Sequence, residues 1–250
     1  MKHLSIAGYV FFSMLSAQII SCNEKKNIPS IDAINALQLK RGEAVFCGST
    51  EKLGSVAFDV SGSEKVKKDF NLAISFLHSF EYDEAEKIFA SIIAEDPACA
   101  MAYWGVAMSN YHALWTPPSE AELDKGKKAI AIAQALPQKT EKESAYIDAI
   151  AIFNTDYRNI DHRTRTIRFE KAMEQVYKKF TADKEAAIFY ALALTAAADQ
   201  LLWEVSTVHD SLTWQRPNMP LRRPDLRLLF LRILFLLHHI QKSVKKKGRG

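Results

Sequence analysis

The stretch HSFEYDEAEKIFASIIAEDP, residues 78–97, decides which fold is predicted for this chain. Its many carboxylates suggest a metal or acid/base site, so their position on the secondary structure matters. Apolar side chains recur every three or four residues, the pattern of one helical face: Tyr82, Ala85, Ile88, Phe89, Ile92 and Ile93. Glu84, Glu86 and Glu95 fall outside this stripe and are expected to face water. The acidic cluster therefore indicates a helix with a polar outer face, not an active site.

Amphipathic helices of the same kind are predicted throughout residues 63–198. Asp96 and Pro97 are expected to start one of them, as cap and first-turn proline. Capping boxes, in which Ser or Thr is followed three residues later by Glu, are predicted to start two others at Ser119 and Thr140. Together these signals predict seven helices in pairs, the last of which ends near residue 198.

The helix pairs repeat with the 34-residue period of a tetratricopeptide (TPR) unit. If Pro97 closes the first unit, residues of suitable size occupy its characteristic positions: Leu72, Ala73, Phe76, Ala85 and Phe89. Ala73 and Ala85 are expected where the two helices of the pair approach closely. The later units are degenerate, and the loop ALWTPPS lengthens the turn of the second one. The predicted fold is all-α, a TPR-like α-solenoid of about three to four antiparallel helix pairs.

Part of the chain is similar to a family of secreted bacterial TPR proteins. The resemblance runs from about Leu53 to Ala198 and rests on these stretches: FLHSFEYDEAEKIF, EDPACAMAYWGVAMS, LWTPPS, DHRTRTIRFEKAM and EAAIFYALAL. The resemblance implies a helical-repeat fold and export from the cytoplasm. It carries over no catalytic residue.

Residues 1–21 have the features of a lipoprotein signal peptide. Lys2 and His3 give a positive start, an apolar run follows, and the sequence IISC ends at Cys22. A cysteine after a small residue resembles a bacterial lipobox, which implies cleavage before Cys22 and lipidation of its sulfur. The alternatives are an ordinary signal peptide or a membrane helix, for which about 17 apolar residues is the short limit. We expect a protein of the bacterial cell envelope, held on a membrane by its lipid.

Residues 22–62 are predicted to form a tether and an irregular lead-in to the helices. The sequence NEKKN is charged, and Ser55–Val60 alternates in the manner of a short strand or an extended segment. Cys47 and Cys99 would lie in an oxidising compartment, where a disulfide is permitted. The alternative is two unpaired thiols, with Cys99 buried on a helix.

Residues 199–250 depart from the family and from the composition of the helices before them. Residues 181–200 contain eight alanines and residues 201–250 contain none; the latter carry 10 Lys+Arg against 3 Asp+Glu. One interpretation is a basic amphipathic helix that contacts an anionic membrane or a partner. The favoured one is a frameshifted or truncated sequence, whose open end would expose apolar surface around Phe189 and Leu192. An exported protein is not expected to bind nucleic acid through this tail.

The chain lacks the motifs G-x-S-x-G, H-E-x-x-H and C-x-x-C and a Gly-rich loop, so no catalytic residue, metal or cofactor is predicted. TPR surfaces bind extended peptides in a concave groove, whose walls come mainly from the first helix of each pair. Helical phase gives these candidates for the groove: Asn71, Ser75, His78, Asn110 and Tyr111. Trp115 either plugs the groove or forms one wall of a pocket. The main functional prediction is a non-enzymatic interaction protein that binds a protein or peptide partner.

Histidines give the second functional hypothesis, a small-ligand or metal-dependent activity. His78 is expected either to pack between helices or to act as a ligand. Asp161, His162 and Arg163 either cap the helix that follows or form a small site for anionic contacts. Under the second hypothesis, His78, His112 and the loop of Asp161 and His162 would carry the activity.

Overall fold

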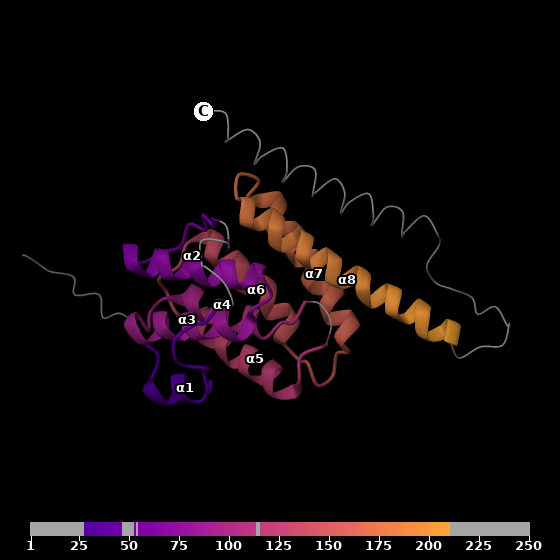
Figure 1. Cartoon of the computed structure of the whole chain (residues 1–250), viewed down its shortest axis with the longest axis horizontal. Helices are drawn as coiled ribbons and strands as arrows, with labels where there is room; N and C mark the ends of the chain where they lie inside the picture. Colours follow the sequence, from indigo (N-terminus) through magenta and orange to yellow (C-terminus); the bar gives the residue numbers. More distant parts are fainter. Residues whose placement is uncertain (1–27, 47–52, 54, 114–115, 211–250) are drawn as a thin grey trace, which may run out of the picture.

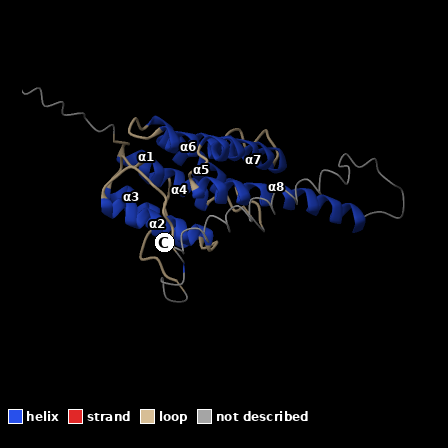
Figure 2. Ribbon diagram, turned by 90° about the horizontal axis from the view of Figure 1, so that it is seen from above, coloured by secondary structure: helices blue, strands red, loops and turns tan. Residues whose placement is uncertain are grey.

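The computed structural model describes residues 28–46, 53, 55–113 and 116–210, with side chains as far as Ala198. Over these residues the chain forms eight α-helices and no strand, which confirms the all-α class (Figures 1 and 2). The helices are α1 (Ile31–Asn35), α2 (Glu64–His78), α3 (Tyr82–Glu95), α4 (Ala100–Ser109), α5 (Glu120–Ala135), α6 (Glu141–Asn154), α7 (His162–Lys179) and α8 (Lys184–Asp210). The predictions for the signal peptide, Cys22, Cys47, Trp115 and residues 211–250 lie outside the described residues.

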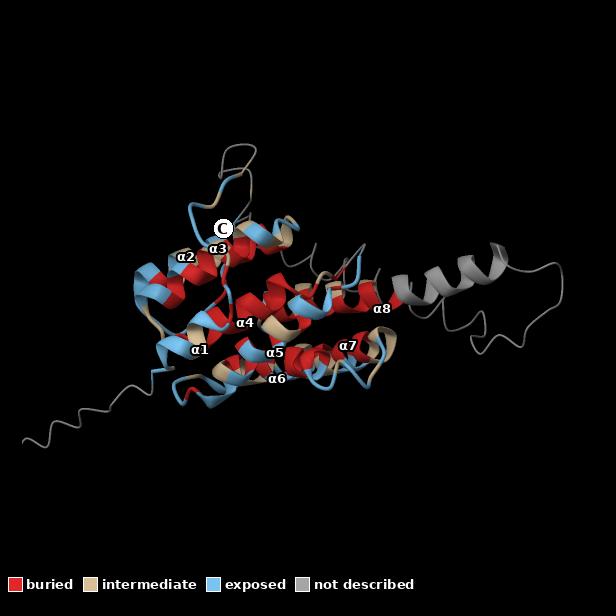
Figure 3. Ribbon diagram, turned by 90° about the horizontal axis from the view of Figure 1, so that it is seen from below, coloured by how far each residue is buried: buried red, intermediate tan, exposed pale blue. Residues whose placement is uncertain are grey.

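Helix α4 lies at the centre of the molecule. From α2 onward each helix packs against the next one along the chain, and α4 also contacts α2 and α6. All ten residues of α4 are buried, as Figure 3 shows in red. A helix that is covered on every side needs apolar residues on every side. This explains its sequence, AMAYWGVAMS.

The capping signals in the sequence are largely confirmed. Both predicted capping boxes form, at Ser119 before α5 and at Thr140 before α6. The prediction for Asp96 is wrong, because α4 begins only at Ala100. The Asp96 carboxylate instead accepts a hydrogen bond from the backbone N–H of Ala98 at 3.2 Å. Asp96 therefore stabilises the turn before the helix, and the helix starts one turn later than predicted.

Helices α2, α4 and α6 are each followed by a residue with a positive φ: Phe80 (62°), His112 (46°) and Asp156 (54°). After α2, the Phe80 N–H donates to Leu77 and the Glu81 N–H to Phe76, each at 3.0 Å. These two bonds form a Schellman motif, which satisfies the last carbonyls of the helix. A left-handed residue thus recurs after every second helix of this series.

The first helix falls in a region that was predicted to be irregular. Residues 22–62 contain α1, where the Ser30 side chain accepts a hydrogen bond from the Ala33 N–H at 3.2 Å. The cap explains why these few residues turn into a helix. Ser55–Val60 forms no strand, so of the two alternatives only the extended segment remains.

The last helix is longer than predicted. Helix α8 continues past residue 198 to Asp210, because neither Gly nor Pro interrupts the sequence in between. Of the two residues around which exposed apolar surface was predicted, Leu192 is partly exposed, whereas Phe189 is buried, with 2% of its surface exposed. Its ring lies 5.3 Å from that of Trp104 in α4. None of the helices in the described part of the chain is long and apolar enough to cross a membrane.

Glu86 on α3 also differs from its prediction, because it is buried and does not face water. One oxygen accepts from Lys125 Nζ at 2.8 Å and from the Lys40 N–H at 2.9 Å, and the other from Asn110 Nδ2 at 3.0 Å. Helix α3 is covered by both α2 and α4, so its buried arc is wider than its apolar stripe. Glu86 thereby connects α3 to α4, to α5 and to the segment that follows α1.

Candidate functional site

Helices α2, α4 and α6 direct aromatic and polar side chains toward one region, which receives the ring of Phe58. The Phe58 ring centroid lies 5.2 Å from that of Phe70, 5.9 Å from that of Trp104 and 5.1 Å from that of Tyr146. We call this region the inner face and define it by these residues: Phe70 and Asn71 of α2, Trp104 of α4, and Lys142 and Tyr146 of α6. Of the residues predicted to line a groove, Asn71 belongs to the inner face, and His78 lies on the same helix.

The segment Ser55–Ser61 lies across the inner face. The Asn71 carboxamide binds both polar main-chain groups of Phe58. Its Oδ1 accepts from the Phe58 N–H at 2.7 Å, and its Nδ2 donates to the Phe58 carbonyl at 3.3 Å. Phe58 and Val60 are buried, whereas the residue before each of them is exposed. This alternation is that of an extended chain with one face against the protein. One side chain of the inner face thus binds both main-chain hydrogen-bonding groups of a single residue, Phe58.

Glu143 of α6 holds the other end of the segment. It is buried, and its two oxygens accept from the Ser61 N–H at 2.6 Å and from Ser61 Oγ at 2.8 Å. The same carboxylate accepts from the Thr140 N–H at 2.6 Å in the capping box. Lys142, next to Glu143 on α6, also contacts the segment, because its Nζ lies 5.4 Å from the centroid of the Phe58 ring. The segment is therefore fixed by α2 at Phe58 and by α6 at Ser61.

The beginning of α8 packs against the inner face, where the Phe189 ring contacts those of Trp104 and Tyr146, and against His78 of α2. Its Glu185 carboxylate lies 2.8 Å from His78 Nε2 of α2, and the Phe189 ring lies 5.2 Å from the His78 ring. Asp183, just before α8, accepts a hydrogen bond from the Tyr146 hydroxyl at 3.1 Å. Burial, together with the Asp183 charge, raises the pKa of Tyr146. His78 therefore packs and bonds between helices, which is the first of its two predicted roles.

The other predicted groove residues also contact the protein itself. Ser75 is buried, and its hydroxyl donates to the Asn71 carbonyl at 3.0 Å. Asn110 is buried against Glu86. The Tyr111 ring lies between those of Phe153 and Phe169, and burial raises the pKa of its hydroxyl. Of the five candidates, Asn71 and His78 keep part of their surface exposed.

The predicted loop at Asp161 forms the start of α7. The Asp161 carboxylate caps the helix by accepting from the Thr164 N–H at 2.9 Å, and the bonds from Thr164 lower its pKa. The ring of His162 lies 5.6 Å from that of Phe153, and its Nδ1 is buried without a hydrogen-bond partner. Arg163 is partly exposed in the first turn. Nearby, buried Arg165 donates to the Phe153 carbonyl at 2.9 Å. The capping role predicted for this loop is confirmed for Asp161.

The pH dependence of stability tests the environment of His162. Burial, and then the charge of Arg165, lower its pKa below the usual 6.5. The unfolded chain therefore binds a proton below that pH that the folded chain does not, so stability falls as the pH drops. We expect His162→Asn to flatten this loss between about pH 7 and pH 5 in urea-unfolding curves, because the variant lacks the side chain that takes up this proton on unfolding. Lys171→Gln, an exposed change on the same helix, should leave the slope unaltered; an unaltered slope in both variants contradicts the prediction.

His112 has contacts of its own at the end of α4. Its ring stacks on that of Tyr82 at 5.0 Å, and its Nε2 lies 3.4 Å from Glu122 of α5. His78, His112 and His162 thus each have different neighbours. In the described portion of the chain, no group of three or more His, Cys, Asp or Glu side chains is placed to hold a metal ion.

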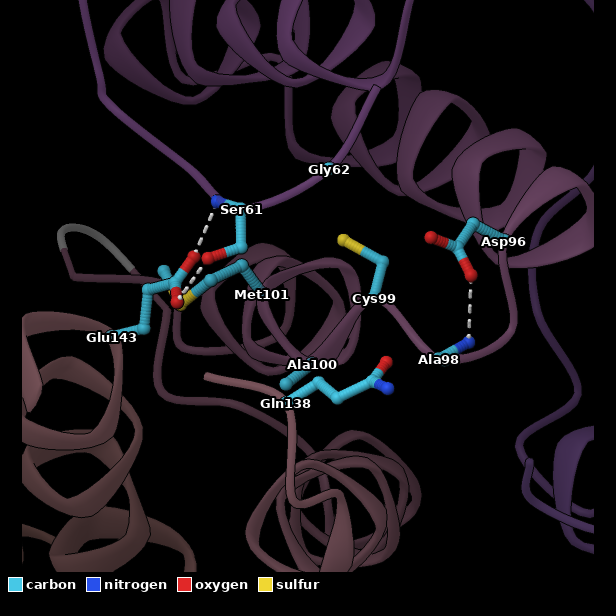
Figure 4. A pocket seen from close by; sticks show the side chains of 9 residues that line it. All are labelled: Ser61, Gly62, Asp96, Ala98, Cys99, Ala100, Met101, Gln138 and Glu143. Carbon is cyan, nitrogen blue, oxygen red and sulfur yellow. Dashed lines mark hydrogen bonds between the residues drawn. The ribbon is translucent and has the colours of Figure 1, made fainter. Parts of the chain in front are cut away.

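A small pocket of about 120 Å³ opens beside the end of the Ser55–Ser61 segment (Figure 4). Ser61 and Glu143 line one side of it, and Asp96 and Cys99 the other. Burial raises the pKa of the Cys99 thiol to about 11, although the N–H groups at the start of α4 act in the opposite direction. The thiol is therefore protonated near neutral pH and is a weak nucleophile. Since Cys47 lies outside the described residues, its pairing with Cys99 stays a prediction.

Comparisons with family models, with curated proteins and with solved structures find no match for this chain.

Several residues of the site were not identified from the sequence. Glu143 was recognised only as part of a capping box, Glu185 only as part of a helix, and Phe189 only as apolar surface at the end of the repeats. Phe58 gave a signal, because the alternation of Ser55–Val60 marks an extended segment with one buried side. That signal does not indicate which helices the segment contacts, because the residues it contacts lie far away in the sequence.

Proposed function

We propose that α2 to α8 form a TPR-like α-solenoid of about three to four degenerate units. The packing of each helix on the next, together with the contacts of α2 with α4 and of α4 with α6, supports this arrangement. Ala73 and Ala85 are completely buried, which suits the close approach of the first helix pair. The left-handed residues after α2, α4 and α6 recur as equivalent turns in repeated units would.

We propose further that the protein is a non-enzymatic interaction module that binds an extended peptide of a partner protein on the inner face. The observation that carries this proposal is the contact of the Asn71 carboxamide with both the N–H and the carbonyl of Phe58. A main-chain clamp of this kind is independent of the bound side chain, so it suits any extended peptide. The aromatic rings around Phe58 supply the apolar surface that such a peptide needs.

A lipid anchor on Cys22 would place this module at the surface of a bacterial envelope membrane. The support is the lipobox-like sequence IISC after an apolar run. Two or three acyl chains at about 0.8 kcal/mol per buried CH₂ suffice for stable anchoring. Growth with labelled palmitate should label the unaltered protein and not Cys22→Ala. A Cys22→Ala protein that is still labelled contradicts the anchor.

Site-specific photo-crosslinking in envelope membranes tests the binding function. A photoreactive amino acid at position 142 lies beside the ring of Phe58, on the inner face. The same group at position 171 is the matched control, because Lys171 is exposed on α7. We expect a discrete partner adduct from position 142 and none from position 171. Equal adducts from both positions, or none from either, contradict binding on the inner face.

A further inference from the structure

We propose that Ser55–Ser61 is a built-in ligand of the inner face, which competes there with external peptides of the same pattern. This inference rests on the binding function proposed above and adds to it the class of ligand and a means of control. The segment belongs to no helix, yet two side chains of different helices bind it: Asn71 and Glu143. Its contacts show what the inner face accepts.

The main chain of the ligand is recognised at two points. Asn71 requires one residue with a free N–H and carbonyl, and Glu143 requires an N–H three residues later. Proline has no N–H and fits neither point. Because the residues between these points are held by no other side-chain hydrogen bond within the described residues, the main chain between them is not further specified.

The side chains of the ligand are recognised at alternate positions. The position of Phe58 takes an aromatic ring among the rings of Phe70, Trp104 and Tyr146. The position of Val60 takes a buried aliphatic group, and that of Asp59 between them is exposed. The last position takes a hydroxyl, since the Ser61 Oγ donates to Glu143 at 2.8 Å. The expected ligand is an extended peptide of the form aromatic–any–aliphatic–Ser or Thr.

The covalent link makes the segment a strong competitor. Gly62 and Ser63 alone separate it from α2, and the φ of 138° at Gly62 permits the sharp turn between them. A segment on so short a connection has an effective concentration on the order of millimolar or higher. To displace the segment, an external peptide needs a higher ratio of concentration to dissociation constant than the segment has. Otherwise it binds only when the segment is weakened. The segment therefore lowers the apparent affinity for a partner.

The experiment uses the full chain and a labelled peptide with the sequence of residues 55–62, SVAFDVSG. Phe58→Ala removes the central anchor of the built-in ligand and leaves the inner face unchanged. We expect the peptide to bind the Phe58→Ala protein at least about 10-fold more tightly than the unaltered protein, by fluorescence anisotropy, because the competitor is weakened. The peptide should also raise the melting temperature of this variant, as a ligand of the folded state does.

Two controls show where the peptide binds. A peptide with Ala in place of Phe should bind at least about 10-fold more weakly, and so should the double variant Phe58→Ala/Asn71→Ala, because each loses one recognition element. If Phe58→Ala does not fold by circular dichroism, Val60→Ala replaces it, with the same order of affinities expected. A folded variant that binds SVAFDVSG no better than a scrambled peptide overturns the inference. If position 142 still forms its partner adduct in that case, the built-in ligand is refuted and the proposed binding function stands. If neither peptide binding nor the partner adduct is found, the built-in ligand and the binding function are both refuted.

Discussion

Glu86→Ala is expected to lower the free energy of unfolding by about 3 kcal/mol or more, because it breaks a buried ion pair and leaves its partners unpaired. Lys125 loses the carboxylate at 2.8 Å while its side chain is only 14% exposed. The Lys40 N–H and one amide hydrogen of Asn110 lose their acceptors in the same step. Urea unfolding, followed by the helical signal in far-ultraviolet circular dichroism, measures the change.

The matched control for this prediction is Glu81→Ala, at the start of the same helix. Glu81 is exposed, and its side chain makes no capping hydrogen bond, so its loss should change stability by no more than about 0.5 kcal/mol. Glu86→Gln keeps the shape and one acceptor oxygen, and should fall between the two. Equal stabilities of Glu86→Ala and Glu81→Ala would show that the buried carboxylate contributes nothing to the packing of α3 on α4 and α5.

Gly105→Ala is expected to destabilise the protein by about 2–3 kcal/mol, although Ala normally stabilises a helix relative to Gly. A Cβ at position 105 overlaps three ring atoms of Phe89: Cδ1, Cε1 and Cζ. Phe89 is completely buried, so its ring cannot move into solvent. Helices α3 and α4 must separate to accommodate the methyl group. The midpoint of urea unfolding measures the effect.

The double variant Gly105→Ala/Phe89→Leu identifies the cause of this effect. Phe89→Leu alone leaves a void and is destabilising, but when position 105 carries a methyl group the smaller side chain removes the overlap. The two changes should therefore cost at least about 1 kcal/mol less together than the sum of the single changes, as expected for residues in contact. Strict additivity would place the cause elsewhere than in the contact between α3 and α4.

Most helix boundaries could be predicted because their signals are local. The capping boxes at Ser119 and Thr140 involve residues three positions apart, and both form as the sequence indicates. The same rule gave a wrong prediction for Asp96, because its carboxylate accepts a hydrogen bond from the Ala98 N–H in a turn. A cap residue and a turn residue have the same sequence signal, since both accept a hydrogen bond from a nearby N–H. The choice between them depends on where the next helix can pack.

The inner face was predicted in part. Helical phase identified Asn71 of the inner face and, on the same helix, His78, and the structure places both next to other segments of the chain. Helical phase could not identify Phe58 or Glu185 as their neighbours. These contacts join residues separated by 13 and 107 positions, and no periodicity within one helix encodes such a pairing.

Local signals in the amino-acid sequence were enough to predict that this protein is helical, where most of its helices start, and that Ser55–Val60 is a short strand or an extended segment. Helical periodicity and helix capping involve residues three or four positions apart, so both can be read from a short stretch of sequence. The packed helices were needed to show that Glu86 is buried, that α8 covers part of α2, α4 and α6, and that the chain's own segment occupies the inner face. Burial depends on how many neighbours cover a helix, and that number is fixed only when the helices pack together.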